Sequence, residues 1–277
     1  MMRNKTTVIY SKNAAYQKFE VLKTNRNKRH RYGEFITEGV RNINAAVNCG
    51  WRINSFIYAN ERKLSRWAED MLKNVPVQIN YALGNNLMDE LSGKTDTSEL
   101  MAIVSTEAPA YKKPQKNPVF VLFHSPSNKG NLGTLLRSCD AFGVDRLVLT
   151  GRGVDIYAPE VVGSSMGSFF NVPFLILTDN NGINNYIADL KREWNALKII
   201  ATSEKAEPAV YETDMTTPVL LLIGNEKDGL SRFYEDLCDM QVKIPMHEKS
   251  VASSLNVSCA ATALLYEVCR QRAVLSH

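Results

Sequence analysis

The stretch Ile244–Glu267, IPMHEKSVASSLNVSCAATALLYE, reads as a strand end, a polar loop and a helix in succession. Ser253 or Ser254 is placed to cap that helix. Asn256 then lies in the first turn with its side-chain amide free, beside backbone N–H groups that have no helical partner. Such a turn can hold a hydroxyl or a phosphate, although a capped, buried helix explains the same residues. Spacings of three and four predict that one helix face is formed by Leu255, Cys259, Thr262, Leu265 and Tyr266.

The overall composition is that of a globular protein. The 277 residues are 44% hydrophobic and 22% charged, which allows a sizeable core. No apolar run approaches the roughly 20 residues that cross a bilayer. The N-terminus, MMRNKTTVIYSKN, is basic but lacks the apolar stretch of a signal peptide. We therefore expect a soluble cytoplasmic protein with no membrane partner.

The cysteines and histidines give no sign of a metal site. The number of cysteines, five, is odd, none forms a CxxC pair, and each lies in an apolar or helical context. Each of the four histidines stands alone, without metal-ligand spacing. His124 follows an apolar run and could reach a pocket, but a structural role is favoured because no orienting partner is evident. We expect no metal and no disulfide framework.

Positive charge is concentrated in the N-terminal part. Residues 1–113 hold 18 basic and 11 acidic residues, a net charge of +7, whereas residues 114–277 hold 15 and 18, a net charge of −3. The densest cluster, LKTNRNKRHRYGEF (22–35), is typical of a solvated surface but also suits a polyanion such as RNA. The candidate RNA-binding residues are four members of this cluster and one nearby arginine: Arg26, Lys28, Arg29, Arg31 and Arg41.

Short strands and helices alternate along the N-terminal part. FIT leads into a helix that closes at Gly50, INSFIYA (53–59) reads as a strand, and SRWAEDMLKNV (65–75) as an amphipathic helix. VQINYA and LMAIVST (100–106) read as further strands, with a short helix between them. This pattern predicts a small α/β domain over residues 1–107. The segment APAYKKPQKNP (108–118), with three prolines and three lysines, reads as a linker.

From residue 119 onward the strands become continuously apolar. The runs VFVLF, RLVLT, PFLIL, LKIIAT, VLLLIG and QVKIP are separated by helical patterns. Buried runs of this kind favour a mostly parallel sheet with helices on both faces, so we expect an α/β domain over residues 119–277. Ligands in such sheets bind at the carboxyl ends of the strands. The segments that follow the strands carry Asn131, Thr202, Gly224 and Glu226, and Arg137 lies within a helix about a turn and a half beyond Asn131.

Several common catalytic motifs are absent from these loops. GNLGTL lacks the lysine and hydroxyl of a P-loop, and no GxGxxG fingerprint opens the first helix. There is also no GxSxG nucleophile elbow. The common hydrolases and dinucleotide-binding enzymes are therefore disfavoured.

Three blocks together resemble the motifs of the SpoU/TrmH family of RNA ribose 2′-O-methyltransferases. They are NKGNLGTLLRSCDAFGV (128–144), LLLIGNEKDGLS (220–231) and the opening stretch, in the family's order. FITEGVRNINAAV (35–47) and TDTSELMAIVS (95–105) resemble the family's small substrate-binding domain, which is similar to certain ribosomal proteins. The resemblance implies a trefoil knot, S-adenosylmethionine as cofactor, a homodimer, and structured RNA as substrate, ribosomal RNA above all.

The resemblance also assigns roles to matching positions. It implies cofactor contacts from Thr202, Gly224, Ile244, Met246 and Leu255. It implies a catalytic and substrate-positioning set of Asn131, Arg137, Glu226, Ser254 and Asn256. Because arginine stays protonated in proteins, we expect Arg137 to grip a phosphate and to act electrostatically. Without the resemblance, a surface salt bridge would explain Arg137, and a charge at a helix entry would explain Glu226.

Two departures from the family pattern concern the cofactor pocket. The loop from Met246 to Ser254 is longer than usual and lacks a glycine, and Lys227-Asp228 replaces a smaller pair. Two alternative functions stay open from the sequence. One is a non-catalytic RNA-binding or ribosome-assembly protein on the same fold, and the other is methylation of a base instead of a ribose.

Overall fold

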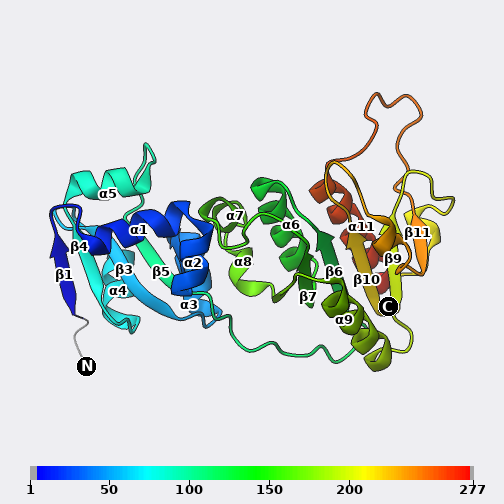
Figure 1. The fold of residues 1–277 in the computed structure, drawn as a ribbon, viewed down its shortest axis with the longest axis horizontal. Coiled ribbons are helices and arrows are strands. Elements are labelled where there is room, and N and C mark those ends of the chain that lie inside the picture. Colours follow the sequence, from blue (N-terminus) through cyan, green and yellow to red (C-terminus); the bar gives the residue numbers. More distant parts are fainter. Residues whose placement is uncertain (1–4, 275–277) are drawn as a thin grey trace. The chain divides into compact units, whose positions relative to one another are not determined.

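The computed structural model describes residues 5–274, which fold into two compact units (Figure 1). Unit 1 comprises the described residues up to Ala110 together with Asp155–Asn171. Unit 2 comprises Tyr111–Val154 and the described residues from Val172 onward. Residues 1–4 and 275–277, which include the start of the basic N-terminus and His277, lie outside the described residues.

Unit 1 is built on a five-stranded mixed sheet of order β1-β4-β3-β5-β2. Its strands are β1 (Thr6–Ile9), β2 (Glu34–Glu38), β3 (Ile53–Ala59), β4 (Asn80–Leu83) and β5 (Leu100–Ser105). Its helices are α1 (Ala14–Thr24), α2 (Arg26–Tyr32), α3 (Val40–Asn48), α4 (Arg66–Asn74), α5 (Asn85–Ser92), α7 (Pro159–Ser164) and α8 (Ser168–Asn171). Strand β5 runs antiparallel to β2 and β3, and the other pairs are parallel.

The two faces of this sheet have separate cores, because side chains alternate along each strand. Ile36 of β2 packs in a cluster with Tyr16, Phe19 and Leu22 of α1. The neighbouring Phe35 points the other way, into a group of aromatic rings spaced at 4.9 to 6.2 Å. The partners of Phe35 in that group are Trp51, Tyr157, Phe169 and Phe170. The segment Asp155–Asn171 is thereby part of the core of unit 1.

A buried ion pair adds a polar link to the same segment. Arg29 of α2 is only 4% exposed, and its Nε donates to Oδ2 of Asp155 at 2.7 Å. Its Nη1 also donates to the backbone carbonyl of Leu22 at 2.9 Å. Helix α2 begins next to Asn25, whose side-chain oxygen accepts the N–H of Lys28. The helix therefore turns one cation of its basic sequence inward and leaves others at the surface.

Unit 2 contains a six-stranded sheet of order β11-β9-β10-β6-β7-β8, in which every pair is parallel. The strands are β6 (Val119–His124), β7 (Arg146–Thr150), β8 (Phe174–Leu177), β9 (Lys198–Thr202), β10 (Val219–Ile223) and β11 (Met240–Val242). The helical segments are α6 (Lys129–Ala141), α9 (Asn180–Glu193), η1 (Val210–Glu212), α10 (Arg232–Glu235) and α11 (Val257–Val274). Each predicted apolar run forms one strand, so the predicted parallel α/β sheet is confirmed.

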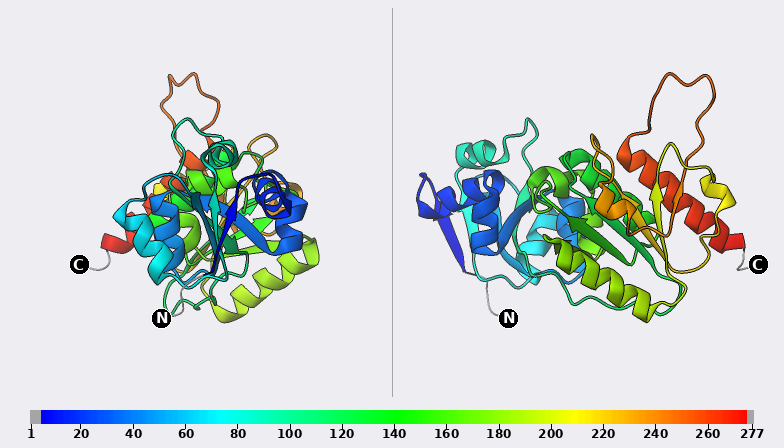
Figure 2. Two further views of the ribbon diagram at one scale, coloured as in Figure 1. Left: turned by 90° about the vertical axis from the view of Figure 1, so that its left-hand side faces the viewer. Right: turned by 45° about the vertical axis from the view of Figure 1, so that its right-hand side comes forward.

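Helices cover both faces of this sheet. Phe120 and Leu122 of β6 pack with Ile187 and other residues of α9 on one face. Helices α6 and α11 lie on the opposite face (Figure 2), where Val121 and Phe123 are also buried. Among residues 5–274, no helix combines the length and the apolar character that a membrane span requires.

Helix α11 differs from its prediction in its start and in its buried face. It begins at Val257, and the residue that caps it is Asn256, whose Oδ1 accepts the N–H of Ser258 at 2.9 Å. The predicted serine caps are therefore wrong, and the Asn256 amide is not free. The buried side chains are Ser258, Ala261, Leu264, Leu265, Glu267 and Val268. Of the predicted face, Leu255, Cys259 and Tyr266 are exposed.

Small residues explain this shift of the buried face. Ser258 Oγ donates to the backbone carbonyl of Asn131 at 2.8 Å, and the hydroxyls of Ser138 and Thr262 lie 2.6 Å apart. Both contacts join α11 to α6. Close approach of two helices requires small side chains at the contact, so Ser258 and Thr262 face α6, whereas Cys259 and Tyr266 lie on the exposed side of α11.

Candidate active site

A pocket of about 500 Å³ lies at the carboxyl edge of the sheet in unit 2. It is formed where β9, β10 and β11 end and where α6 and α11 begin. Nine of the ten residues that the sequence assigned to catalysis or to the cofactor line it. They are Asn131, Thr202, Gly224, Glu226, Ile244, Met246, Ser254, Leu255 and Asn256. The tenth, Arg137, is not among the lining residues.

The end of β10 brings a glycine against another stretch of backbone. A Cβ atom added to Gly224 would lie 2.4 Å from the carbonyl carbon of Gly229 and 2.6 Å from the nitrogen of Leu230. Asn225 and Gly229 exchange two backbone hydrogen bonds, of 2.9 and 3.0 Å, which fold this loop back on itself. Only glycine fits at position 224 without moving that turn. Ile223, Leu230 and Ala260, which the sequence reading did not single out, add apolar wall.

Glu226 fastens the loop after β10 to the loop after β6. Its Oε2 accepts the backbone N–H of Ser127 at 3.0 Å and the hydroxyl of Ser127 at 2.6 Å. Its Oε1 accepts the N–H of Asn128 at 3.2 Å and the side-chain Nδ2 of Asn131 at 3.2 Å. The carboxylate is thus engaged in four hydrogen bonds that position the entry of α6.

These hydrogen bonds keep the carboxylate ionised. Partial burial acts to raise the pKa of Glu226, but the hydrogen bonds from Ser127 and Asn131 together outweigh it and lower the pKa below its ordinary value of 4.5. A carboxylate that accepts several N–H and O–H donors is stabilised in its charged form. Glu226 is therefore suited to orient neighbouring groups and is a poor proton acceptor near neutral pH.

The hydrogen bonds continue from Glu226 to the start of α11. Asn131 donates to Glu226 through Nδ2, so its Oδ1 is left to accept, and Nδ2 of Asn256 donates to it at 3.1 Å. The Oδ1 of Asn256 caps α11 through Ser258. The orientation of each amide is therefore fixed by its neighbour, and the three side chains form one row along the pocket edge.

A further hydrogen bond joins the same two loops, and its residues were not predicted from the sequence as part of the site. Nδ2 of Asn225 donates to the carbonyl of Ser125 at 2.6 Å, and Ser125 has a positive φ of 46°. Asn128 caps α6 by accepting the N–H of Asn131 at 3.0 Å. The only sequence signal for these residues was their place in loops rich in Gly, Asn and Ser.

The side chains of Arg137 and Ser254 form no hydrogen bond or ion pair with any residue of the described chain. Arg137 lies on α6 six residues beyond Asn131, about 9 Å along the helix axis, and its side chain is exposed. Ser254 lies at the pocket edge, at the end of a loop whose residues 247–253 are all exposed. This loop projects from unit 2 (orange in Figure 1). Both side chains are therefore available to a bound substrate.

His124 is held within unit 2 away from the pocket wall. Its Nδ1 lies 3.3 Å from the Thr150 hydroxyl, and its ring packs against Tyr234 with centroids 4.5 Å apart. Burial lowers the pKa of His124 and favours the neutral ring. The arrangement agrees with the structural role that the sequence favoured for this histidine.

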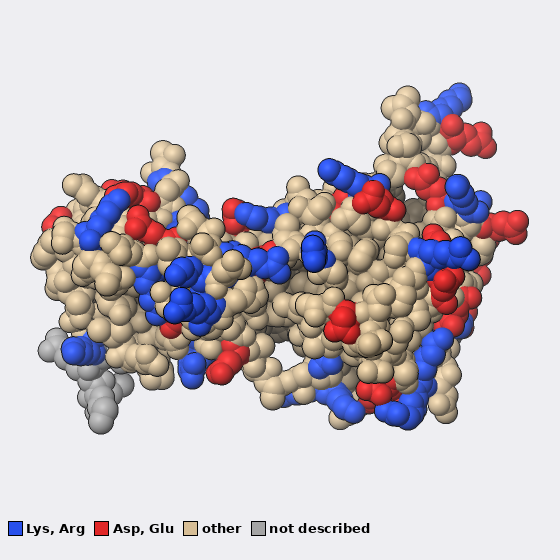
Figure 3. Space-filling view, viewed as in Figure 1, with Lys and Arg blue, Asp and Glu red and all other residues tan. Residues whose placement is uncertain are grey.

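The candidate RNA-binding residues of unit 1 fall into two groups. Arg26, Arg31 and Arg41 are exposed and Lys28 is half-buried. Basic side chains gather over the region of α2 (Figure 3). Arg29 does not belong to that surface, because it is buried against Asp155. Its guanidinium serves the fold of unit 1, and we leave it out of the proposed RNA contact.

Both units contain residues that match known protein families. Residues 118–266 match the model of the SpoU rRNA Methylase family, and residues 13–102 match the SpoU L30e-like domain. The chain is 39% identical over 267 residues to the 23S rRNA (uridine(2479)-2′-O)-methyltransferase of Streptomyces viridochromogenes, covering 95% of this chain and 92% of that protein. It is 26% identical to the 23S rRNA (guanosine-2′-O-)-methyltransferase RlmB of Pseudomonas putida, covering 78% and 77% respectively.

Solved structures give the same result. The fold matches the crystal structure of the SpoU methyltransferase AviRb from Streptomyces viridochromogenes in complex with the cofactor AdoMet, with a TM-score of 0.87 and 38% identity. That match covers 95% of this chain and 99% of the AviRb chain. The family model spans more than half of the chain, and the row of Glu226, Asn131 and Asn256 lies within it. The chain therefore belongs to the SpoU rRNA Methylase family.

Proposed function

We propose that this protein transfers a methyl group from S-adenosylmethionine to the 2′-hydroxyl of a ribose in structured RNA. The RNA class that we propose is ribosomal RNA. The observation that carries the proposal is the pocket of unit 2. Its edge carries the hydrogen-bonded row Glu226, Asn131 and Asn256, and part of its wall is apolar. The 23S rRNA 2′-O-methyltransferase named above supports the substrate class. Because ribosomal RNA is the proposed substrate, we place the protein in the cytoplasm.

The residues of the pocket fit the proposed cofactor. Ile244, Met246 and Leu255 offer apolar contact for a planar ring, and Thr202 and the backbone at Gly224 offer polar contact. The cofactor supplies an electrophilic methyl group on a cationic sulfonium. The ionised carboxylate of Glu226 at the pocket edge is electrostatically compatible with that positive charge.

The chain itself has to align a hydroxyl for in-line displacement. Asn131 and Asn256 are held in fixed orientations, which suits them to hold the ribose, with the Ser254 hydroxyl beside them. Arg137, exposed and always protonated, is suited to grip a neighbouring phosphate with its planar fork. Glu226 is proposed as a positioning residue, since all of its bonds run to the loops of the site.

We also propose two features that the family resemblance implies, the trefoil knot and the homodimer. The division of the sequence into residues 1–107, 108–118 and 119–277 stays a prediction from its composition, and it counts Asp155–Asn171 with the C-terminal part although that segment packs in unit 1. The exposed outer side of α11, with Cys259 and Tyr266, supports a surface for a second copy of the chain. Sedimentation of the purified protein measures this directly. A monomer at all concentrations up to the millimolar range would contradict the dimer.

The function is tested with labelled S-adenosylmethionine and deproteinised 23S ribosomal RNA. A methylated 2′-hydroxyl cannot assist cleavage of the adjacent phosphodiester bond, so alkaline hydrolysis should leave one resistant linkage. Label on a base, with normal hydrolysis, would assign base methylation instead. Calorimetry supplies the second arm: we expect micromolar binding of S-adenosylmethionine that is lost in Leu255→Arg. RNA binding without cofactor binding near millimolar concentrations would identify a non-catalytic RNA-binding protein.

A further inference from the structure

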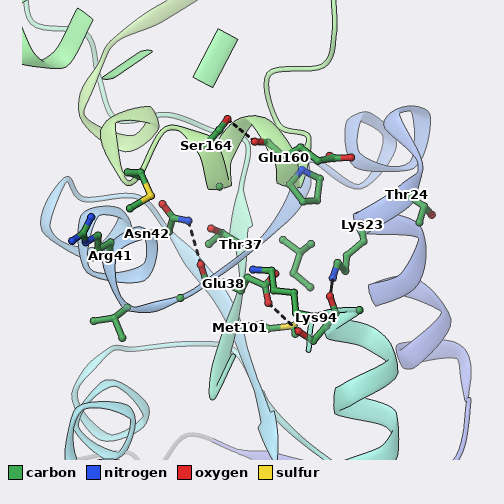
Figure 4. A pocket seen from close by; sticks show the side chains of 18 residues that line it. Lys23, Thr24, Thr37, Glu38, Arg41, Asn42, Lys94, Met101, Glu160 and Ser164 are labelled. Atoms are coloured by element: carbon green, nitrogen blue, oxygen red, sulfur yellow. Dashed lines mark hydrogen bonds and ion pairs between the residues drawn. The ribbon is translucent and has the colours of Figure 1, made fainter. Parts of the chain in front are cut away.

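Unit 1 contains a pocket of its own, with a volume of about 840 Å³ (Figure 4). It lies where β2 ends and α3 begins, and its other walls come from α1, α5 and α7. Ile36, Met101, Pro159 and Met166 supply apolar surface. Pockets of roughly 300 to 1,000 Å³ accommodate small molecules or single residues of a polymer. Of its lining residues, only Arg41 has been given a functional role above.

Two buried oxygens of the pocket-lining residues lack a hydrogen bond within the described chain. Thr37 is 4% exposed, and its Oγ1 has no partner. Asn42 is 8% exposed; its Nδ2 donates to the carbonyl of Glu38 at 3.2 Å, but its Oδ1 has no partner. Buried polar atoms in proteins are nearly always paired. The two oxygens therefore point to a ligand that brings hydrogen-bond donors to this wall.

The start of α3 contributes donors to the same pocket. Gly39, at φ 89°, precedes the helix, and no side chain caps it. The first N–H groups of a helix have no partner within the helix and favour an anion. Arg41, in the first turn of α3, is exposed beside them. The pocket thus combines acceptors, donors and a cation around an apolar floor.

The basic side chains around the pocket outnumber the acidic ones by one, which is compatible with a piece of RNA. Its walls hold three basic side chains, Lys23, Arg41 and Lys94, and two acidic ones, Glu38 and Glu160. The Lys94 ammonium pairs with Glu38 at 2.6 Å, so part of this charge is held inside the wall. The chain runs from Lys23 and Thr24 of the wall, through one residue, into the basic helix α2. The rim of the pocket is therefore continuous with the basic surface proposed to bind RNA.

We propose that this pocket binds one unpaired nucleotide of the RNA substrate. The base lies against Pro159 and Met166 and donates to Thr37 and Asn42, and its phosphate lies at the start of α3 beside Arg41. Unpaired bases carry both donors and acceptors on their edges and are the usual points at which proteins read RNA sequence. The inference rests on the proposed function, since it requires an RNA substrate. Unit 1 would then recognise one nucleotide in this pocket, in addition to binding RNA phosphates through its basic surface.

Two substitutions test the pocket by independent routes. Thr37→Val keeps the shape of the side chain and removes only the unpaired hydroxyl oxygen, so the fold should be as stable as before. Gly163→Phe fills the pocket from α7, where an added Cβ meets nothing within 4 Å and the backbone φ is not positive. Gly163→Ala is the matched control, because it adds a methyl group at the same open position.

The measurement is binding of each full-length variant to the 23S ribosomal RNA that the wild-type protein methylates. We expect affinity to fall about tenfold or more for Gly163→Phe and severalfold for Thr37→Val, within the range for loss of a stacked base. S-adenosylmethionine binding, thermal unfolding and the Gly163→Ala variant should be unchanged. Wild-type RNA affinity in both test variants would refute the proposal that the pocket binds a nucleotide. If Gly163→Phe fails to fold, the RNA affinity of Thr37→Val alone tests the proposal.

The two proposals can fail separately in this design. If the wild-type protein adds no methyl group to any ribosomal RNA, the proposed function fails before the variants are compared. If the wild-type protein methylates RNA and both variants do so with unchanged affinity, only the nucleotide pocket is refuted.

Discussion

Replacing Glu226 by glutamine tests whether its carboxylate positions the site. The four donors around it come from Ser127, Asn128 and Asn131, two on each carboxylate oxygen. In Glu226→Gln one oxygen becomes an NH₂ group. In one orientation it faces the N–H of Asn128 and the Nδ2 of Asn131, and in the other it faces the backbone N–H of Ser127, whose hydroxyl can turn to accept. A neutral hydrogen bond contributes about 1 kcal/mol net, and one to a charged group about 1.5 to 3 kcal/mol. Because Glu226 is half-buried, we take the lower end, about 2 kcal/mol.

A loss of about 2 kcal/mol from the arrangement that binds the transition state corresponds to about a 30-fold lower kcat/KM. The assay is methyl incorporation into ribosomal RNA at subsaturating RNA. Asp228→Asn is the matched control, since it removes the same charge from the same exposed loop, and we expect activity within twofold of wild type. If Glu226→Gln also stays within twofold of wild type, the positioning role is refuted.

The pH dependence of Glu226 gives a second readout of the same reasoning. Its pKa is lowered in the folded protein, so its hydrogen bonds stabilise the site above the ordinary pKa of 4.5 and are lost as pH falls through the lower folded value. The carboxylate therefore stays ionised from pH 6 to 9. Any titration of activity in that range should appear at the same pH in Glu226→Gln. Its disappearance in the variant would identify Glu226 as the titrating group instead.

Three further predictions concern separate parts of the chain. Gly224→Ala should abolish S-adenosylmethionine binding in calorimetry and lower the thermal midpoint, because its Cβ would meet the backbone of Gly229 at 2.4 Å; unchanged affinity would contradict the close approach. Arg137→Ala should lose methyl transfer with cofactor binding intact, and Arg137→Lys should recover only part of it; full activity in Arg137→Ala would exclude the phosphate role. Arg29→Ala should cost about 3 kcal/mol of unfolding free energy, since it removes the guanidinium from a buried carboxylate that otherwise accepts, within the described chain, only the Tyr157 N–H and lies near the His30 ring. Arg26→Ala should weaken RNA binding without unfolding, and equal stability of the two variants would refute the distinction.

The strands of both sheets were the most predictable feature. Strand β3 forms at residues 53–59, as the sequence predicts, and each apolar run of unit 2 forms a parallel strand. These features depend on local hydrophobic patterns. The site follows from the same logic, because the ends of parallel strands converge at one edge of a sheet. That geometry alone brings nine of the ten expected residues to one pocket.

Features that depend on distant partners could not be predicted in this way. Helix α2 has the sequence RNKRHRY, with no apolar period, and its inward residue is Arg29, whose partner Asp155 lies 126 positions away. Ser127 and Glu226 meet across 99 positions through polar loops that carry no pattern. The start of α11 was misjudged for a related reason, since the capping role of Asn256 becomes visible only when Asn131 is beside it.

The membership of Asp155–Asn171 in unit 1 has a consequence for dissecting this protein. The connection between β7 and β8 leaves unit 2, contributes Phe169 and Phe170 to the aromatic core of unit 1, and returns. A fragment that begins at Tyr111 would therefore carry both phenylalanines without the Phe35 and Trp51 rings that cover them, and would be prone to aggregate. Neither unit corresponds to one continuous segment of the sequence that could be exchanged by itself. A chimera with a relative's RNA-binding unit would have to transplant this internal segment together with the N-terminal part.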